Sequence, residues 1–166
     1  MKRFRGTARR RRNPSKNPYL FIDYIPIINV EKMEYLINEA SQGMGLKKKF
    51  VSGEDIGDHR LVYIASDGKC YHTNADSVST MPVVGISCDA ISSGSEGEIL
   101  FIGLIKSDNW NWTTGGGNGM LYASTEAGAL TQTKPLSTGN QVQIVGIVIT
   151  ETLILFNPNY VIVEVQ

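Results

Sequence analysis

Few residues of the chain have the types and spacing that catalysis requires. A serine or cysteine hydrolase needs its nucleophile on a strained turn beside a histidine base, and the sequence contains no Gly-x-Ser-x-Gly motif. Its two histidines are His59 and His72. His72 lies in the alternating segment Cys70-Tyr71-His72, so a side chain packed on a pleated sheet explains it better than a catalytic base. We therefore expect no enzymatic activity.

Metal and phosphate chemistry are also poorly represented. Zinc takes three or four closely spaced ligands, whereas Cys70 and Cys88 have neither Cys-x-x-Cys spacing nor a histidine cluster and are expected to be reduced and buried. The glycine run at 115–119 lacks the Lys-Ser/Thr pair and the helix of a phosphate-binding loop. The carboxylates Glu54, Asp55 and Asp58 miss the EF-hand ligand pattern. We expect no metal and no cofactor.

The two tryptophans are the candidates for a surface ligand contact. Trp110 and Trp112 alternate in Asn-Trp-Asn-Trp-Thr, so on an extended segment both indoles point to the same side. Such a pair suits stacking on a sugar ring or a subunit interface. Packing in a core or interface is the simpler interpretation, and the ligand contact is its alternative.

Charge divides the chain into two unlike parts. Residues 1–49 hold 12 Lys and Arg against 4 Asp and Glu, a net charge of +8, while residues 50–166 hold 4 against 12, a net charge of −8. Such asymmetry indicates a tail and a body with different partners.

The basic residues are densest at the start of the chain. This segment has almost no apolar area to offset the entropy of ordering it, so alone it is expected to be disordered. Phosphates or a groove lined by carboxylates would order it by pairing with its guanidinium groups, and a solvated tail is the alternative. The expected partner-binding residues are Lys2, Arg3, Arg5, Arg9, Arg10, Arg11, Arg12 and Lys16.

An apolar stretch and a short helix are expected next. Residues 19–28 are mostly Leu, Ile, Phe and Tyr, and Pro26 blocks a helix, so this strip is expected to be buried against a partner or the body. Its candidate contact residues are Tyr19, Phe21, Tyr24 and Ile25. Asn29 as an N-cap and Gly43 as a stop predict a helix over 30–42.

The apolar residues of this helix have the spacing of a coiled-coil seam. They recur at intervals of 3, 4, 3 and 4, which favours self-association, although a helix packed against a domain shows the same spacing. The seam residues are Val30, Met33, Ile37, Ala40 and Met44. Gly43, Gly45 and the lysines at 47–49 predict a linker to the body.

The body over 50–166 is predicted to be all β, a sandwich or a barrel. Short runs of Val, Ile, Tyr, Phe and Thr alternate with glycine and Asp, Asn or Ser turns, and Asp67-Gly68 is a strong hairpin signal. The chain thus divides into an attachment arm (1–28), a helix and linker (29–49) and this β-rich head domain. Strands are expected near residues 60–65, 69–72, 82–90, 98–107, 120–124, 130–132, 141–150, 152–156 and 161–165.

The body also shows a weak internal repeat. Residues 61–66 resemble 120–125, residues 84–86 resemble 145–147, and residues 99–101 resemble 154–156, in the same order in both copies. The repeat predicts two related β subunits in one domain. Chance similarity among β-rich segments is the alternative.

A series of motifs extends over residues 61–165, about two thirds of the chain. In order these are Val62-Tyr63, Ser66-Asp67-Gly68-Lys69, Met81-Pro82-Val83-Val84-Gly85, Asp108-Asn109-Trp110-Asn111-Trp112-Thr113, residues 121–133, Gln143-Ile144-Val145-Gly146 and Leu155-Phe156-Asn157-Pro158. In these motifs and their order, the segment resembles the head fibre and capsid decoration proteins of tailed bacteriophages.

This resemblance implies a trimeric, non-enzymatic knob on the outside of a virion. Such a protein would be made in the host cytoplasm and would bind the major capsid protein through its N-terminal segment. No apolar run reaches the length of a bilayer span, so no membrane association is expected. The arginine density of the arm exceeds what attachment needs and keeps nucleic acid as a second partner. Two other functions stay open: a genome-binding coat protein with a basic internal arm, and a receptor-binding or glycan-binding tail-fibre module that uses the tryptophans.

Overall fold

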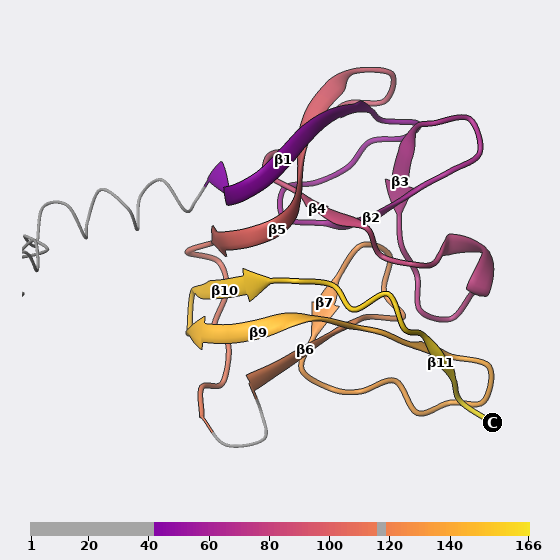
Figure 1. Cartoon of the computed structure of the whole chain (residues 1–166), viewed down its shortest axis with the longest axis vertical. Coiled ribbons are helices and arrows are strands. Elements are labelled where there is room, and N and C mark those ends of the chain that lie inside the picture. The colour runs from indigo at the N-terminus through magenta and orange to yellow at the C-terminus, as the bar shows by residue number, and fades with distance from the viewer. Residues whose placement is uncertain (1–41, 116–118) are drawn as a thin grey trace, which may run out of the picture.

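Strands dominate the computed structural model, which describes residues 42–115 and 119–166 (Figure 1). A short 3₁₀ turn, η3 (Val78–Thr80), lies between the third and fourth strands. No helix within these described ranges is long and apolar enough to cross a membrane. The all-β prediction for the body is confirmed. The strands are β1 (Met44–Val51), β2 (Leu61–Ile64), β3 (Cys70–His72), β4 (Gly85–Ser87), β5 (Glu96–Lys106), β6 (Met120–Ala123), β7 (Leu130–Thr131), β8 (Gln141–Val142), β9 (Ile144–Thr150), β10 (Leu153–Phe156) and β11 (Val163–Glu164).

Each of the nine predicted strand regions contains a strand. The hairpin at Asp67-Gly68 is also present, because β2 pairs antiparallel with β3 and Gly68 has a φ of +77°. The continuous strand expected over 141–150 is wrong at one residue: it is divided at Gln143 into β8 and β9. Gln143 is fully buried, and its side-chain amide bonds the backbone of another segment, so the chain is held there by its side chain.

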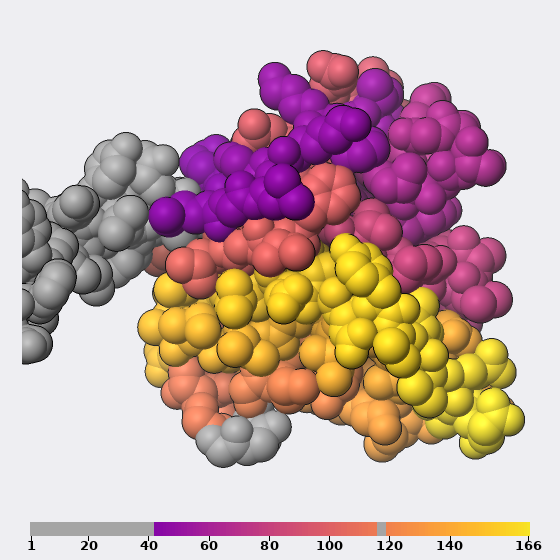
Figure 2. Space-filling view, viewed as in Figure 1, coloured from indigo at the N-terminus to yellow at the C-terminus, as the bar shows by residue number. Residues whose placement is uncertain are grey.

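The linker predicted over 43–49 is wrong, because residues 44–51 form strand β1. This strand pairs antiparallel with β5 along its whole length, from Met44 opposite Leu104 to Val51 opposite Glu96. In Figure 2 its indigo surface lies directly against the salmon surface of β5. Met44 is therefore the first residue of a strand and not the end of a helical seam. The arm at 1–28 and the helix expected from residue 30 fall outside the described residues.

The strand order repeats itself, as the sequence repeat predicted. The main sheet follows the path β3-β2-β4-β5-β10-β9-β6-β7, so that β2, β4 and β5 of the first half correspond to β6, β9 and β10 of the second. Residues that match in the sequence repeat also occupy matching register positions. The paired residues are Leu61, Ile86 and Leu100 in the first half and Met120, Ile147 and Leu155 in the second.

The described residues form two hydrophobic clusters, and the main one holds the two halves together. The main core draws buried residues from both halves, among them Leu61, Leu100, Leu121 and Phe156. The second cluster consists of Ile56, Val62, Cys70, Ile91 and Ile99 and lies on the first half alone. Successive residues of a strand face opposite sides, so the neighbours Ile99 and Leu100 place the two clusters on opposite faces of the first half.

Candidate ligand pocket

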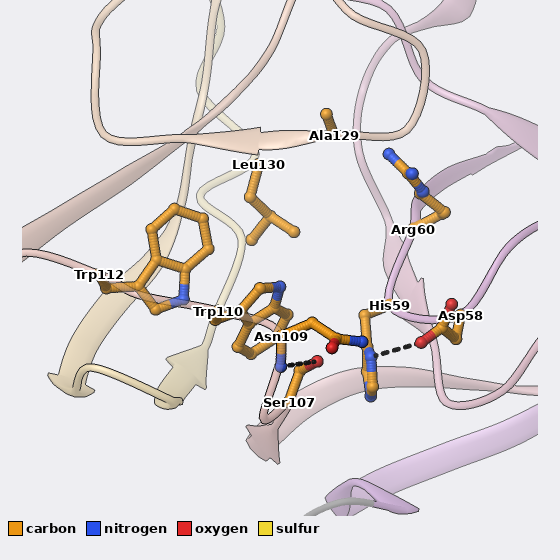
Figure 3. A pocket seen from close by; sticks show the side chains of 9 residues that line it. All are labelled: Asp58, His59, Arg60, Ser107, Asn109, Trp110, Trp112, Ala129 and Leu130. Atoms are coloured by element: carbon orange, nitrogen blue, oxygen red, sulfur yellow. Dashed lines mark hydrogen bonds and ion pairs between the residues drawn. The ribbon is translucent and has the colours of Figure 1, made fainter.

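The described residues place the two tryptophans together in one pocket. The attachment residues between Lys2 and Ile25, and the seam residues Val30, Met33, Ile37 and Ala40, lie outside the described part of the chain. The pocket has a volume of about 300 Å³, at the lower end of the range for small-ligand sites. Its lining residues are Asp58, His59, Arg60, Ser107, Asn109, Trp110, Trp112, Ala129 and Leu130 (Figure 3).

Backbone hydrogen bonds fix the strip that carries both indoles. After β5 the chain turns at Ser107, whose carbonyl accepts the amide of Trp110 at 3.2 Å. The amide of Trp112 donates to the carbonyl of Glu151 at 2.9 Å. The side chain of Gln132 then bonds Thr113 in both directions, accepting from its amide at 3.0 Å and donating to its carbonyl at 2.8 Å. The strip is thus held by its own turn and by two distant segments, at Glu151 and Gln132.

The prediction that both indoles share one side is confirmed. Their ring centroids are 5.6 Å apart with the planes tilted by 49°, and both indoles are partly buried against the main core. They therefore pack on the core and line the pocket at once. Trp112 Nε1 is buried without a hydrogen-bond partner among the described residues, a condition that costs about 1 to 3 kcal/mol.

His59 completes an aromatic row that the sequence analysis did not assign. Its ring lies 5.2 Å from that of Trp110, and Figure 3 shows Trp110 between His59 and Trp112. Its Nδ1 is 3.3 Å from Asp58 Oδ2. The φ of His59 is +54°, a left-handed conformation that is uncommon outside glycine and clusters at binding sites. This conformation depends on contacts with distant segments, so no local sequence signal could have identified it.

The lining combines flat apolar surfaces with polar groups at the rim. The rings of His59, Trp110 and Trp112 provide faces for stacking, while Asp58, Arg60 and Asn109 provide a carboxylate, a guanidinium and an amide. The Asp58 side chain is 60% exposed and so can accept hydrogen bonds from a ligand. Rings with apolar faces and hydroxyl edges match this combination.

The other groups considered for chemistry are engaged elsewhere. Glu54 Oε1 accepts from the backbone amide of His72 at 2.7 Å and lies 3.0 Å from its Nδ1, so His72 is a packed side chain of β3, as predicted. Asp55 accepts the amide of Ser93 at 2.8 Å. Within residues 42–115 and 119–166, no three His, Cys, Asp or Glu side chains lie close enough together to hold a metal ion.

Both cysteines are buried, as predicted, and neither is bridged to the other. Burial raises the pKa of Cys88 to about 11 and also raises the pKa of Cys70. A thiol is a nucleophile only as its thiolate, so both groups are poor nucleophiles at neutral pH.

Comparison with known proteins adds no assignment. The chain matches no protein-family model and no curated protein.

Proposed function

We propose that this chain is a structural protein of a bacteriophage particle, a capsid decoration or head fibre protein held by its N-terminal arm. The proposal rests on the uneven distribution of charge along the chain. Residues 1–17 contain eight Lys and Arg and no acidic residue, whereas residues 18–166 contain eight against sixteen, a net charge of −8. An acidic remainder of the chain behind a purely basic leader is suited to attachment at one end.

Attachment of this kind works by binding free energy alone. Guanidinium groups form short, often bidentate hydrogen bonds with carboxylates, so the arm would bind acidic grooves between subunits of the major capsid protein. The apolar strip at 19–28 would be buried in the same contact. The body would then project from the particle, and the proposed assembly is a homotrimer on the capsid exterior.

The resemblance to phage decoration proteins supports this reading. Its motifs lie in the β2–β3 hairpin, in the segment that leads into β4, in the tryptophan strip after β5, in β6 and β7, and in β9 and β10.

Deleting residues 1–17 tests the proposal. The shortened body should keep its β-rich circular dichroism spectrum and its unfolding temperature, because the deletion removes little apolar area. It should be absent from particles assembled in its presence, as measured by its amount in purified particles. Full incorporation of the shortened chain would refute attachment through the arm. A variant with Arg9, Arg10, Arg11 and Arg12 all changed to Gln keeps the chain length and is the matched control for charge.

A glycan-binding body is a second candidate, favoured by the aromatic row and the left-handed His59. The test is a titration with neutral oligosaccharides followed by tryptophan fluorescence, in wild type, Asp58→Asn and Asp108→Asn. Asp108 is the control because its carboxylate, 84% exposed, pairs with Lys106 and does not line the pocket. Binding that Asp58→Asn weakens and Asp108→Asn does not would support this function. An unchanged spectrum with every sugar would exclude it for those sugars.

A further inference from the structure

Arg60 is the one arginine among the described residues, and it lines the pocket of Trp110 and Trp112, which we call the tryptophan pocket. The described part of the chain contains twelve Asp and Glu residues, yet none of them forms an ion pair with Arg60. The side chain is partly buried, and burial of a charge without a partner is unfavourable. An unpaired guanidinium beside a pocket therefore points to a ligand that supplies its partner.

The position of Arg60 is fixed by its backbone and by the stem of its side chain. Its amide donates to Ser87 Oγ at 2.9 Å, and its carbonyl accepts the amide of Ser87 at 2.9 Å. A Cβ on Gly57 would lie 3.4 Å from Arg60 Cγ and Nε, and a Cβ on Gly128 would lie 3.1 Å from Arg60 Cβ. The stem thus packs closely against two backbone segments, which leaves the guanidinium at the end of the side chain to meet a ligand.

The left-handed conformation of His59 explains how three consecutive side chains reach one pocket. Successive side chains of an extended segment point to opposite sides, so Asp58 and Arg60 would face away from His59. The φ of +54° at His59 interrupts this alternation, and all three residues line the pocket. An uncommon backbone conformation thereby brings a carboxylate, an aromatic ring and a guanidinium to one site.

The two charged side chains of this triplet point in different directions. Asp58 Oδ2 lies 3.3 Å from His59 Nδ1, and Figure 3 shows the guanidinium of Arg60 turned away from this pair and toward Ala129. An anionic group can therefore meet Arg60 without lying against Asp58. The Asp58 carboxylate, 60% exposed, stays available to accept hydrogen bonds from hydroxyl groups.

The remaining lining groups suit a single ring that carries hydroxyl groups. Trp110 and Trp112 present flat apolar faces, and a pyranose ring has apolar C–H faces that stack on indoles. Asn109 adds an amide that both donates and accepts hydrogen bonds. The volume of about 300 Å³ is small for a ligand site, so one ring is expected to enter the pocket.

A carboxylate suits Arg60 better than a phosphate does. The two oxygens of a carboxylate match the planar fork of a guanidinium, which binds them bidentately. A phosphate monoester carries close to two negative charges at neutral pH. Residues 50–166 have a net charge of −8, and Asp58 lies in the same pocket, so the repulsion is weaker for the singly charged group.

We propose that the tryptophan pocket binds an acidic sugar, a uronic acid whose carboxylate pairs with Arg60 while its ring stacks on the indoles. The proposal rests on the glycan-binding function given above as the second candidate, and it goes beyond that function by naming the class of sugar. It assigns to Arg60 the choice between acidic and neutral sugars.

Titration of the full chain with galacturonic acid, its methyl ester and galactose tests this assignment. Both tryptophans of the chain lie in the pocket, so their fluorescence reports on this site. The acid should bind at least about tenfold more tightly than the ester or galactose, because a charge-assisted hydrogen bond adds to the stacking. Glucuronic acid, its methyl ester and glucose form a second set with the opposite configuration at C4.

Substitutions of Arg60 show whether it causes the preference. Arg60→Gln should abolish the preference for the acid and leave the affinity for galactose unchanged. Arg60→Lys keeps the charge but not the planar fork, and should retain only part of the preference. Lys69→Gln removes the same charge at an exposed position outside the pocket, and should bind each sugar as wild type does.

Four results would overturn the proposal. Wild type with equal affinity for acid and ester in both sets would refute it, as would a preference for the acid that survives Arg60→Gln. Tighter binding of galactose 6-phosphate than of galacturonic acid would assign the site to phosphate. A response to acetate as strong as that to galacturonic acid would show that the ring is not recognised. Circular dichroism checks folding, and the acid and ester comparison in wild type carries the test if Arg60→Gln does not fold.

The same measurements separate this proposal from the functions proposed above. Equal binding of galactose and galacturonic acid would leave glycan binding standing and refute the role of Arg60, whereas no binding of any sugar would refute both. Incorporation of Arg60→Gln into particles should equal that of wild type, because attachment is assigned to the arm. Loss of incorporation in the arm deletion alone therefore bears on the virion role and not on the pocket.

Discussion

At the scale of single residues, a few buried polar groups decide how the segments meet. Gln143 is the clearest case, because its side chain is fully buried and bonds two other segments. Its Oε1 accepts the amide of Val83 at 2.8 Å, and its Nε2 donates to the carbonyls of Val83 at 3.0 Å and of Asn159 at 2.8 Å. This one amide joins the chain before β4 to the chain after β10.

Gln143→Leu should therefore be severely destabilising. It keeps the approximate volume but leaves one buried donor and two carbonyls without these partners, at about 1 to 3 kcal/mol for each unsatisfied group. We expect the free energy of unfolding, measured with urea, to fall by about 3 kcal/mol or more. Gln132→Leu removes an amide that also bonds the backbone twice, but at an exposed site, and should cost less than about 1 kcal/mol. An equal fall in the free energy of unfolding of the two variants would contradict the structural role given to Gln143.

The thiol of Cys88 predicts a pH dependence at alkaline pH. Its pKa rises from 9.0 to about 11 because burial disfavours the thiolate. A group whose pKa is higher in the folded state stabilises the fold below its unfolded pKa, and that stability is lost as the pH rises toward the folded value. The free energy of unfolding should fall between about pH 9 and pH 11, less steeply in Cys88→Ala.

Iodoacetamide labelling provides an independent check on the same thiol. At pH 8 the native protein should leave Cys88 unlabelled, whereas the urea-unfolded chain should be labelled at both cysteines. Rapid labelling of native Cys88 would mean that it is accessible as a thiolate.

At the scale of elements, β1 is the part that sequence patterns could not identify. Its lysines at 47–49, beside Gly43 and Gly45, have the composition of a linker. They suit an edge strand as well, because one side of an edge strand faces water. Gly45 faces Gly103 across the β1–β5 pair, and a Cβ on Gly45 would lie 2.7 Å from Gly103 Cα. Position 45 therefore requires glycine because the two backbones approach closely there, and not because the segment is flexible.

The remaining strands were predictable because β-branched and aromatic runs between turn signals are a local property. The pocket was predictable only in part. The alternation of Trp110 and Trp112 is visible in the sequence, but His59 lies about 50 residues away and meets them through the fold. The interruption between β8 and β9 at Gln143 could not be predicted from the sequence, because it is caused by a contact with Val83, 60 residues away.

The ion pair between Lys47 and Glu98 contributes to holding β1 on β5. The hydrogen bond from Lys47 lowers the pKa of Glu98, so the pair stabilises the fold above the ordinary carboxyl pKa and weakens as the pH falls below it. Lys47→Met should lower the free energy of unfolding at pH 7 by less than about 1 kcal/mol, since Glu98 is 41% exposed. The variant should also lose less stability than wild type when the pH is lowered from 7 to 4. Lys48→Met, on the other face of β1, is the control, and thermal unfolding at pH 7 and pH 4 is the measurement. A steeper acid loss in Lys47→Met than in wild type would contradict the assignment.

At the scale of the whole molecule, salt dependence separates two uses of the basic arm, since capsid carboxylates and nucleic-acid phosphates are both negative. If the arm bound a genome, a peptide of residues 1–17 should bind any nucleic acid, and the logarithm of its affinity should fall with the logarithm of salt concentration by about 0.9 for each phosphate neutralised on duplex DNA. If the arm binds a capsid groove, the peptide should prefer particles that lack the protein over nucleic acid at physiological salt. Fluorescence anisotropy of the labelled peptide measures both. Weak, salt-insensitive binding to nucleic acid would exclude the coat-protein function.

The full-length pairing of β1 with β5 has a mechanical consequence. Any pull on residues before Met44 reaches the body at the first residue of a strand that pairs with β5 at all eight of its positions, with one shift of register between Leu46 and Lys47. A pull along the strand axis loads those positions in shear, all together, whereas a pull across it would open them one after another. A tether fixed in this way resists rupture when tugged lengthwise, and a body exposed to flow on a moving surface would benefit from that resistance.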